Sequence, residues 1–174
     1  MRYGLVVAVL LLMLVLPAGG TSASASRLYR NQGVTLRYPE RWFATTRSLT
    51  HVTDPRQIVA IASYPLPSSN RGDDGCQPKE ALDHLPADGA FIYGWEYRPD
   101  SGFGPPRRVD FSPKPAHFKL SGYRDYECLG RSFVLAFREI GRYFQVHVAL
   151  GHQASATTRR AVLSVLDSFA AKRR

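Results

Sequence analysis

Hydrophobic and polar residues alternate along several stretches of the chain, which is the pattern of β-strands with one buried face. The strongest alternation covers 132–138 and 143–150, and the short connection between them contains Gly141, so a β-hairpin is predicted there. Further strands are predicted over the following ranges: 34–38, 42–45, 58–64, 90–97 and 118–120. The sequence therefore predicts a mostly antiparallel sheet.

Two segments have the period of a helix instead. Pro78 precedes a short predicted helix over 79–85, because the first helical turn accepts proline. A second helix is predicted over about 157–171, with apolar residues spaced to form one buried stripe. Strands joined by short turns, with one short internal helix and one C-terminal packing helix, predict an α+β domain. We expect one domain over 26–174, without an internal repeat.

The N-terminal segment has the pattern of a secretory signal peptide. A short basic start is followed by the apolar run 5–16, and the small residues 23–25 follow the A-x-A spacing of a cleavage site. The alternative is a transmembrane anchor, but a spanning helix needs roughly 20 apolar residues and this run is shorter. We therefore expect 1–25 to be removed after Ala25, and the mature protein to be secreted or extracytoplasmic, with no transmembrane segment.

The chain contains two cysteines, Cys76 and Cys128, and the predicted export determines how they are interpreted. An even number of cysteines in an exported chain predicts a disulfide bond. The alternatives are a thiol nucleophile and a metal ligand. Neither cysteine is in a C-x-x-C motif and neither has a histidine within a few residues, so the disulfide is favoured.

Composition and charge narrow the class of partner. The 174 residues are 44% hydrophobic and 21% charged, which fits a globular core and not a disordered chain. The formal net charge of +9 becomes +8 when Arg2 is lost with the leader, a balance that favours anionic partners. Most of the basic residues are arginine, which binds carboxylate or phosphate through two points, although a GC-rich genome produces the same bias. Nucleic acid is not expected as the partner of an exported protein.

Aromatic side chains dominate one face of the predicted strand 90–97. Phe91, Tyr93, Trp95 and Tyr97 share that face, and either a core or a stacking surface for a ligand would use such a stripe; the core is favoured. Glu96 lies on the opposite face among small and apolar residues. If that face is covered, Glu96 needs a cation, for which Arg138 is the candidate, because an unpaired buried carboxylate would be neutral.

The segment 98–117 contains five prolines and little periodicity. Long irregular segments inside a compact domain are usually functional or mobile. This loop and its neighbourhood contain four basic residues that we predict as the binding surface for an anionic partner: Arg98, Arg107, Arg108 and Lys119.

Common catalytic motifs are missing from the sequence. It has no G-x-S-x-G, S-x-x-K, H-E-x-x-H, Walker or G-x-G-x-x-G motif. His147 and His152 are the closest pair of histidines, and they would share a metal only if the chain turned after Leu150. We predict no catalytic residues, no metal site and no cofactor. The alternative is a small secreted hydrolase that uses Glu96, or a histidine with a carboxylate, in a cleft.

The segment 34–42, a strand followed by Pro39, two residues and Trp42, resembles the opening of the PsbP-like fold family, which includes small exported bacterial proteins. The hairpin and helix that close the chain, ending in 165–169, are similar to the family's C-terminus. Arg41 departs from the family pattern, in which glycine commonly precedes the tryptophan. The resemblance implies an α/β/α sandwich and a binding or accessory module, not an enzyme. The function expected is thus that of a secreted binding module, whose partner is the cell envelope, another anionic component or another protein. A further possibility is a purely structural subunit of a complex.

Overall fold

The computed structural model describes residues 25–68, 75, 77–100, 106–126 and 129–173, which form two β-sheets and two α-helices. Most neighbouring strands are antiparallel, and only β6 is parallel to its described partner β8. The architecture confirms the predicted α+β class. The larger sheet has the order β3 (Phe43–Ala44), β4 (Arg56–Ala62), β5 (Ala90–Tyr97), β9 (Arg142–Leu150), β8 (Gly130–Glu139) and β6 (Ser112–Pro113), and β7 (Tyr123–Tyr126) also pairs with β8. The smaller sheet has the order β1 (Ser26–Asn31), β2 (Val34–Pro39) and β10 (Ala170–Ala171).

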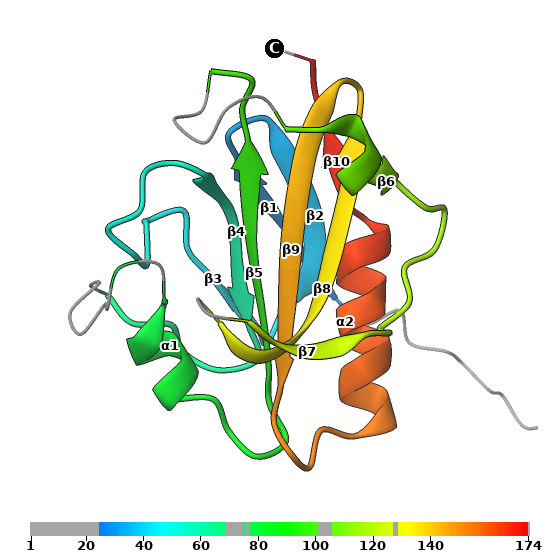
Figure 1. Cartoon of the computed structure of the whole chain (residues 1–174). Coiled ribbons are helices and arrows are strands. Elements are labelled where there is room, and N and C mark those ends of the chain that lie inside the picture. The colour runs from blue at the N-terminus through cyan, green and yellow to red at the C-terminus, as the bar shows by residue number, and fades with distance from the viewer. Residues whose placement is uncertain (1–24, 69–74, 76, 101–105, 127–128, 174) are drawn as a thin grey trace, which may run out of the picture.

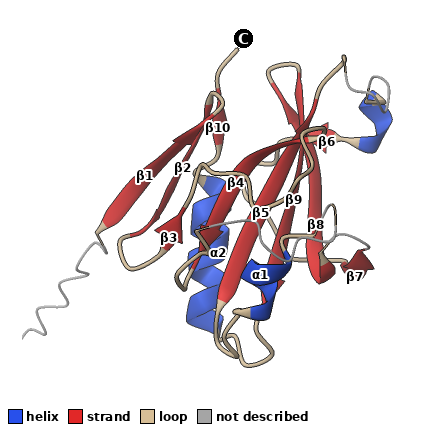
Figure 2. Ribbon diagram, turned by 90° about the vertical axis from the view of Figure 1, so that its left-hand side faces the viewer, coloured by secondary structure: helices blue, strands red, loops and turns tan. Residues whose placement is uncertain are grey.

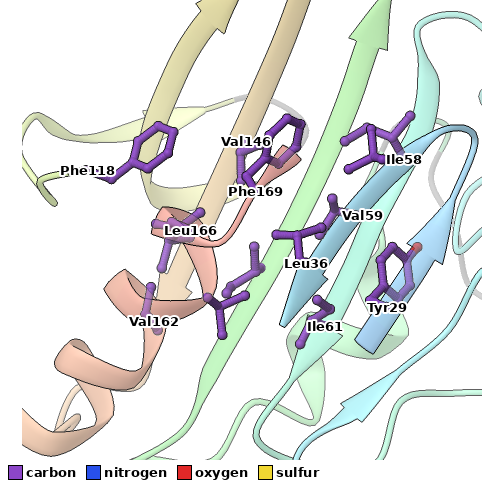
Figure 3. Packing of buried hydrophobic residues seen from close by; sticks show 14 of the residues in the cluster. Tyr29, Leu36, Ile58, Val59, Ile61, Phe118, Val146, Val162, Leu166 and Phe169 are labelled. Carbon is purple, nitrogen blue, oxygen red and sulfur yellow. The ribbon is translucent and has the colours of Figure 1, made fainter. Parts of the chain in front are cut away.

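The two faces of the larger sheet pack against different elements (Figure 2). Helix α2 (Ala156–Asp167) and the smaller sheet cover one face, and the short helix α1 (Lys79–Asp83) lies over the other. Figure 3 shows the first of these cores, where Leu36 of β2, Ile61 of β4 and Leu166 of α2 converge. The sheet is therefore buried on both sides at its centre.

Strand β5 illustrates this division, because successive side chains of a strand point to opposite faces. Ala90 and Ile92 join the core under α2, whereas Phe91, Tyr93 and Trp95 join the core under α1. These three aromatic rings are buried, so this part of the predicted stripe is core. The fourth residue, Tyr97, is half-buried and its ring packs against Phe111.

Two sequence predictions about the chain after β5 are wrong. No strand forms over 118–120. Instead, Phe118 packs into the core as part of a loop, and its backbone N–H donates to the Asp167 carboxylate at 2.7 Å. The C-terminal helix ends at Asp167 and not at 171. Beyond it, Ala170 and Ala171 pair with the free edge of β2, and this pairing keeps the chain extended.

The predicted leader, apart from Ala25, lies outside the described residues, and so do both cysteines. Among the helices that are described, none combines the length and the apolar character that a membrane-spanning helix needs.

Candidate binding surface

Three of the four predicted binding residues lie at one end of the molecule. Arg98 follows the end of β5, and Arg107 and Arg108 stand at the start of the short helical turn η1 (Arg108–Asp110). The β8–β9 turn and the C-terminus lie at the same end (Figure 1). These segments bring Arg138 and Arg173 to the predicted three, and we call the surface formed by the five arginines the basic end.

Lys119 does not belong to the basic end. It lines a separate cavity of about 520 Å³ on the outer side of β8, together with Pro113, Phe118 and Val134. On β8 the cavity is lined by residues 134–137. Residues 130–133 of β8 pair with β7, and residues 137–138 pair with β6. The predicted set of four is therefore divided between two places.

Acidic neighbours compensate part of the charge at the basic end. Arg107 donates two hydrogen bonds to Asp110, at 2.9 and 3.1 Å, and Arg98 forms a longer ion pair of 3.6 Å with Asp100. Within the described part of the chain, the side chains of Arg108 and Arg173 have no ion pair. Arg138 also has no ion pair among the described residues, but it is half-buried and donates to backbone carbonyls, so Arg108 and Arg173 supply the exposed uncompensated charge.

Two hollows flank the β8–β9 turn, and Ile140 and Gly141 line both. The first, of about 320 Å³, is also lined by Arg98 and Arg173. The second, of about 430 Å³, is lined by Arg108 and Arg138. The Arg138 guanidinium is held in place by backbone carbonyls, since it donates to Phe111 and, at 3.3 Å, to Arg108. The basic end therefore offers arginine side chains on both sides of one projecting turn.

The apolar part of this surface was not predicted from the sequence. Val109, between two charged residues of η1, has 87% of its surface exposed, and Ile140 at the tip of the turn has 42% exposed. Ile140 was predicted only as part of a hairpin connection. The available signal is its position before Gly141, because a two-residue hairpin turn favours Asn or Asp there and isoleucine is unusual.

A second basic surface was also missed. Arg30 of β1 and Arg37 of β2 are both exposed, and the strand register places them on the outward face of the smaller sheet. Arg37 and Arg160 of α2 line a groove of about 520 Å³ between β2 and α2. The signal in the sequence is the density of arginines over 27–41, where Glu40 is the only acid.

Glu96 is enclosed in an ion-pair network. Its carboxylate accepts hydrogen bonds from Arg142 at 2.7 and 2.9 Å and from Arg56 at 2.8 Å. The expected ion pair is present, but the predicted partner Arg138 is wrong. Arg138 pairs in register with Tyr143, whereas Glu96 pairs with Phe144, so Arg138 and Glu96 lie on opposite faces of the sheet.

The histidines do not gather at one place. His147 is buried between β5 and β8, within hydrogen-bonding distance of Ser132 and Gln145, at 3.3 and 2.8 Å. Burial lowers the pKa of His147 from 6.5 to about 3, so the ring is neutral at pH 7. His152 is exposed beyond the end of β9, and the exposed His117 contacts Asp167 at 3.1 Å. In the part of the chain that the structure covers, no three His, Cys, Asp or Glu side chains come together as metal ligands.

Comparison of the sequence with protein-family models and with curated proteins finds no match.

Proposed function

We propose that this protein is an exported, non-enzymatic binding module whose basic end contacts an anionic partner. The observation that carries the proposal is the group of arginines around the β8–β9 turn, of which the exposed Arg108 and Arg173 form no ion pair among the described residues. A guanidinium group matches the two oxygens of a carboxylate or phosphate. The formal charge of about +8 on the chain without its leader adds long-range attraction for such a partner.

The resemblance to the PsbP-like fold family supports the same class of function, since it implies a binding or accessory module. The leader-like segment 1–25 supports export, and export makes the cell envelope the nearest source of anionic groups.

The hydrolase alternative loses its two buried candidates, Glu96 and His147. Its remaining histidine–carboxylate pair among the described residues is the exposed His117 with Asp167, at 3.1 Å beside the cavity that Lys119 lines. Glu96 is only 2% exposed, and two arginines occupy its carboxylate. His147 is 1% exposed, so no substrate reaches its ring. A catalytic acid or base must come within hydrogen-bonding distance of the substrate, and neither group is accessible for that contact.

The proposal is tested by binding to a soluble polyanion, sulfated dextran, with neutral dextran as the control probe. Binding of the purified protein is measured at about 0.01 M and about 0.1 M salt, because the screening length falls from roughly 30 to 10 Å between them. We expect binding to sulfated dextran alone, at least several-fold weaker at the higher salt concentration. Equal binding to both dextrans, or no binding to either, would overturn the proposal.

The position of the site is tested with two variants that remove the same charge. The double substitution Arg107→Ala, Arg108→Ala changes the basic end, and Arg30→Ala, Arg37→Ala changes the outward face of the smaller sheet. We expect the first variant to lose most of the affinity for sulfated dextran and the second to lose much less. An equal loss in both would mean that only net charge matters, and a larger loss in the second would move the site to the smaller sheet; either result contradicts the proposed surface.

A further inference from the structure

The basic end carries two exposed apolar side chains among its arginines. Val109 is 87% exposed on η1, and Ile140 is 42% exposed at the tip of the β8–β9 turn. The two segments adjoin, because Arg108 and Ile140 line the same hollow and Arg138 of β8 donates to the Arg108 carbonyl. The apolar side chains and the cations therefore belong to one surface.

Ile140 occupies a strained backbone position. Its φ is 47°, and that of Gly141 is 80°, so both central residues of the hairpin turn are in the left-handed region. Glycine, asparagine and aspartate adopt this conformation readily, whereas for a β-branched residue it is a genuine outlier. Ile140 nevertheless leaves 42% of its surface exposed. A strained backbone position of this kind points to a functional role for its side chain.

The charges around the two apolar side chains limit the kind of partner. Arg98 and Arg173 lie on one side of Ile140, in a hollow that Asp100 also lines, and Arg108 and Arg138 lie on the other. A soluble acidic polymer would use the arginines but would leave Val109 and Ile140 in water. The area of two separate apolar side chains is also small for a stable protein–protein interface. A layer that presents phosphate groups above an apolar interior would satisfy both kinds of side chain.

We propose that the basic end docks on the surface of a bilayer containing anionic phospholipid, with Val109 and Ile140 entering the boundary between headgroups and acyl chains. The arginines then contact lipid phosphates, and each cation near an anionic surface adds to the attraction. The apolar faces of helices that lie at this boundary reach roughly 5–10 Å into it. The inference rests on the proposed function and names the partner of the same surface.

The test uses Ile140→Asn, because asparagine suits a left-handed turn position. Co-sedimentation is measured with vesicles of phosphatidylglycerol and phosphatidylcholine, and with vesicles of phosphatidylcholine alone. We expect the unchanged protein to bind the anionic vesicles, and Ile140→Asn to weaken this binding by about fivefold, since the headgroup boundary favours apolar side chains. The same variant is expected to unfold at a higher urea concentration than the unchanged protein. A purely structural role of Ile140 does not predict a variant that is more stable against urea and yet binds vesicles more weakly.

Leu28→Asn is the matched control, because Leu28 is 43% exposed on β1 of the smaller sheet, away from the arginines of the basic end. It should bind anionic vesicles as the unchanged protein does. Val109→Ser is the second test variant, since a side chain with 87% exposure is replaceable without unfolding the protein. It should also weaken vesicle binding.

Unchanged vesicle binding by both Ile140→Asn and Val109→Ser would overturn the inference. Equal binding to phosphatidylcholine alone, or an equal loss in Leu28→Asn, would also overturn it. Binding to sulfated dextran without binding to anionic vesicles would exclude the bilayer and leave the proposed function in place, whereas binding to neither would remove both.

Discussion

At the scale of single residues, burial fixes the protonation of His147. The ring is enclosed by Ser132 of β8 and Gln145 of β9, and the Trp95 ring packs edge-on at 5.1 Å. None of these neighbours carries a negative charge that would favour the imidazolium ion. Burial is accordingly the cause that lowers the pKa of His147 to about 3.

This pKa makes stability depend on pH in a predictable direction. Because the pKa of His147 is 6.5 in its ordinary state and about 3 when folded, the unfolded chain binds more protons between these values. The stabilisation that depends on His147 being neutral is therefore present in full above pH 6.5 and is lost as the pH falls toward 3. The unfolding free energy difference between the unchanged protein and His147→Gln should shrink by about 1.4 kcal/mol per pH unit below 6.5.

Urea unfolding at pH 7, 6 and 5, followed by tryptophan fluorescence, measures this difference. Taking the difference between the two unfolding free energies cancels the pH dependence of the carboxylates, which titrate in both proteins. A difference that stays constant across the three pH values would show that His147 keeps its ordinary pKa in the fold.

At the scale of elements, Arg142 connects parts of the chain that are far apart in sequence. Besides Glu96 of β5, its guanidinium donates to the backbone carbonyl of Gln32 in the β1–β2 turn, at 2.9 Å. It also donates to the carbonyl of Lys172 after β10, at 3.1 Å. One side chain of β9 thus holds both sheets and the C-terminal segment together.

Removing the charge of Glu96 should therefore destabilise the whole fold. Glu96→Gln leaves the Arg142 guanidinium, 7% exposed, without its buried counter-charge, and breaking such a pair costs about 3 kcal/mol. The exposed pair Lys79–Asp83 on α1 provides the control, since Asp83→Asn should change the unfolding free energy by about 0.5 kcal/mol or less. Equal effects of the two substitutions in urea unfolding would contradict the structural role of Glu96.

The sequence predicted strands at the positions of β2, β3, β4, β5, β8 and β9, and it missed β1, β6, β7 and β10. The prediction of β5 agrees in both bounds, and those of β8 and β9 agree within two residues at each end. Strand β1 was missed because four of its six residues are exposed, and β10 is only two residues long and depends on the edge of β2. Arg98, Arg107 and Arg108 were predicted as binding residues, but Ile140 was not. Its place beside them depends on the order of β5, β9 and β8 in the sheet, which the sequence pattern does not reveal.

At the scale of the whole molecule, the predicted Cys76–Cys128 disulfide would link two positions that are 52 residues apart in the sequence. Both cysteines lie outside the described residues, but Ala81 of α1 and Leu129, a few residues from either, belong to one buried cluster. Intact mass after alkylation, with and without reductant, should show two thiols only after reduction. The double substitution of both cysteines by serine should lower the unfolding free energy by roughly 4 kcal/mol. Two alkylated thiols in the oxidised, exported protein would exclude the bond.

The position of the C-terminus has a practical consequence for every binding measurement. Arg173 lines one of the two hollows beside Ile140, and the chain leaves the fold there. A purification tag, fluorophore or surface tether attached at that terminus would emerge among the arginines and screen them from vesicles and polyanions. Immobilisation through α1, on the opposite face of the larger sheet from α2, keeps this end open to solution.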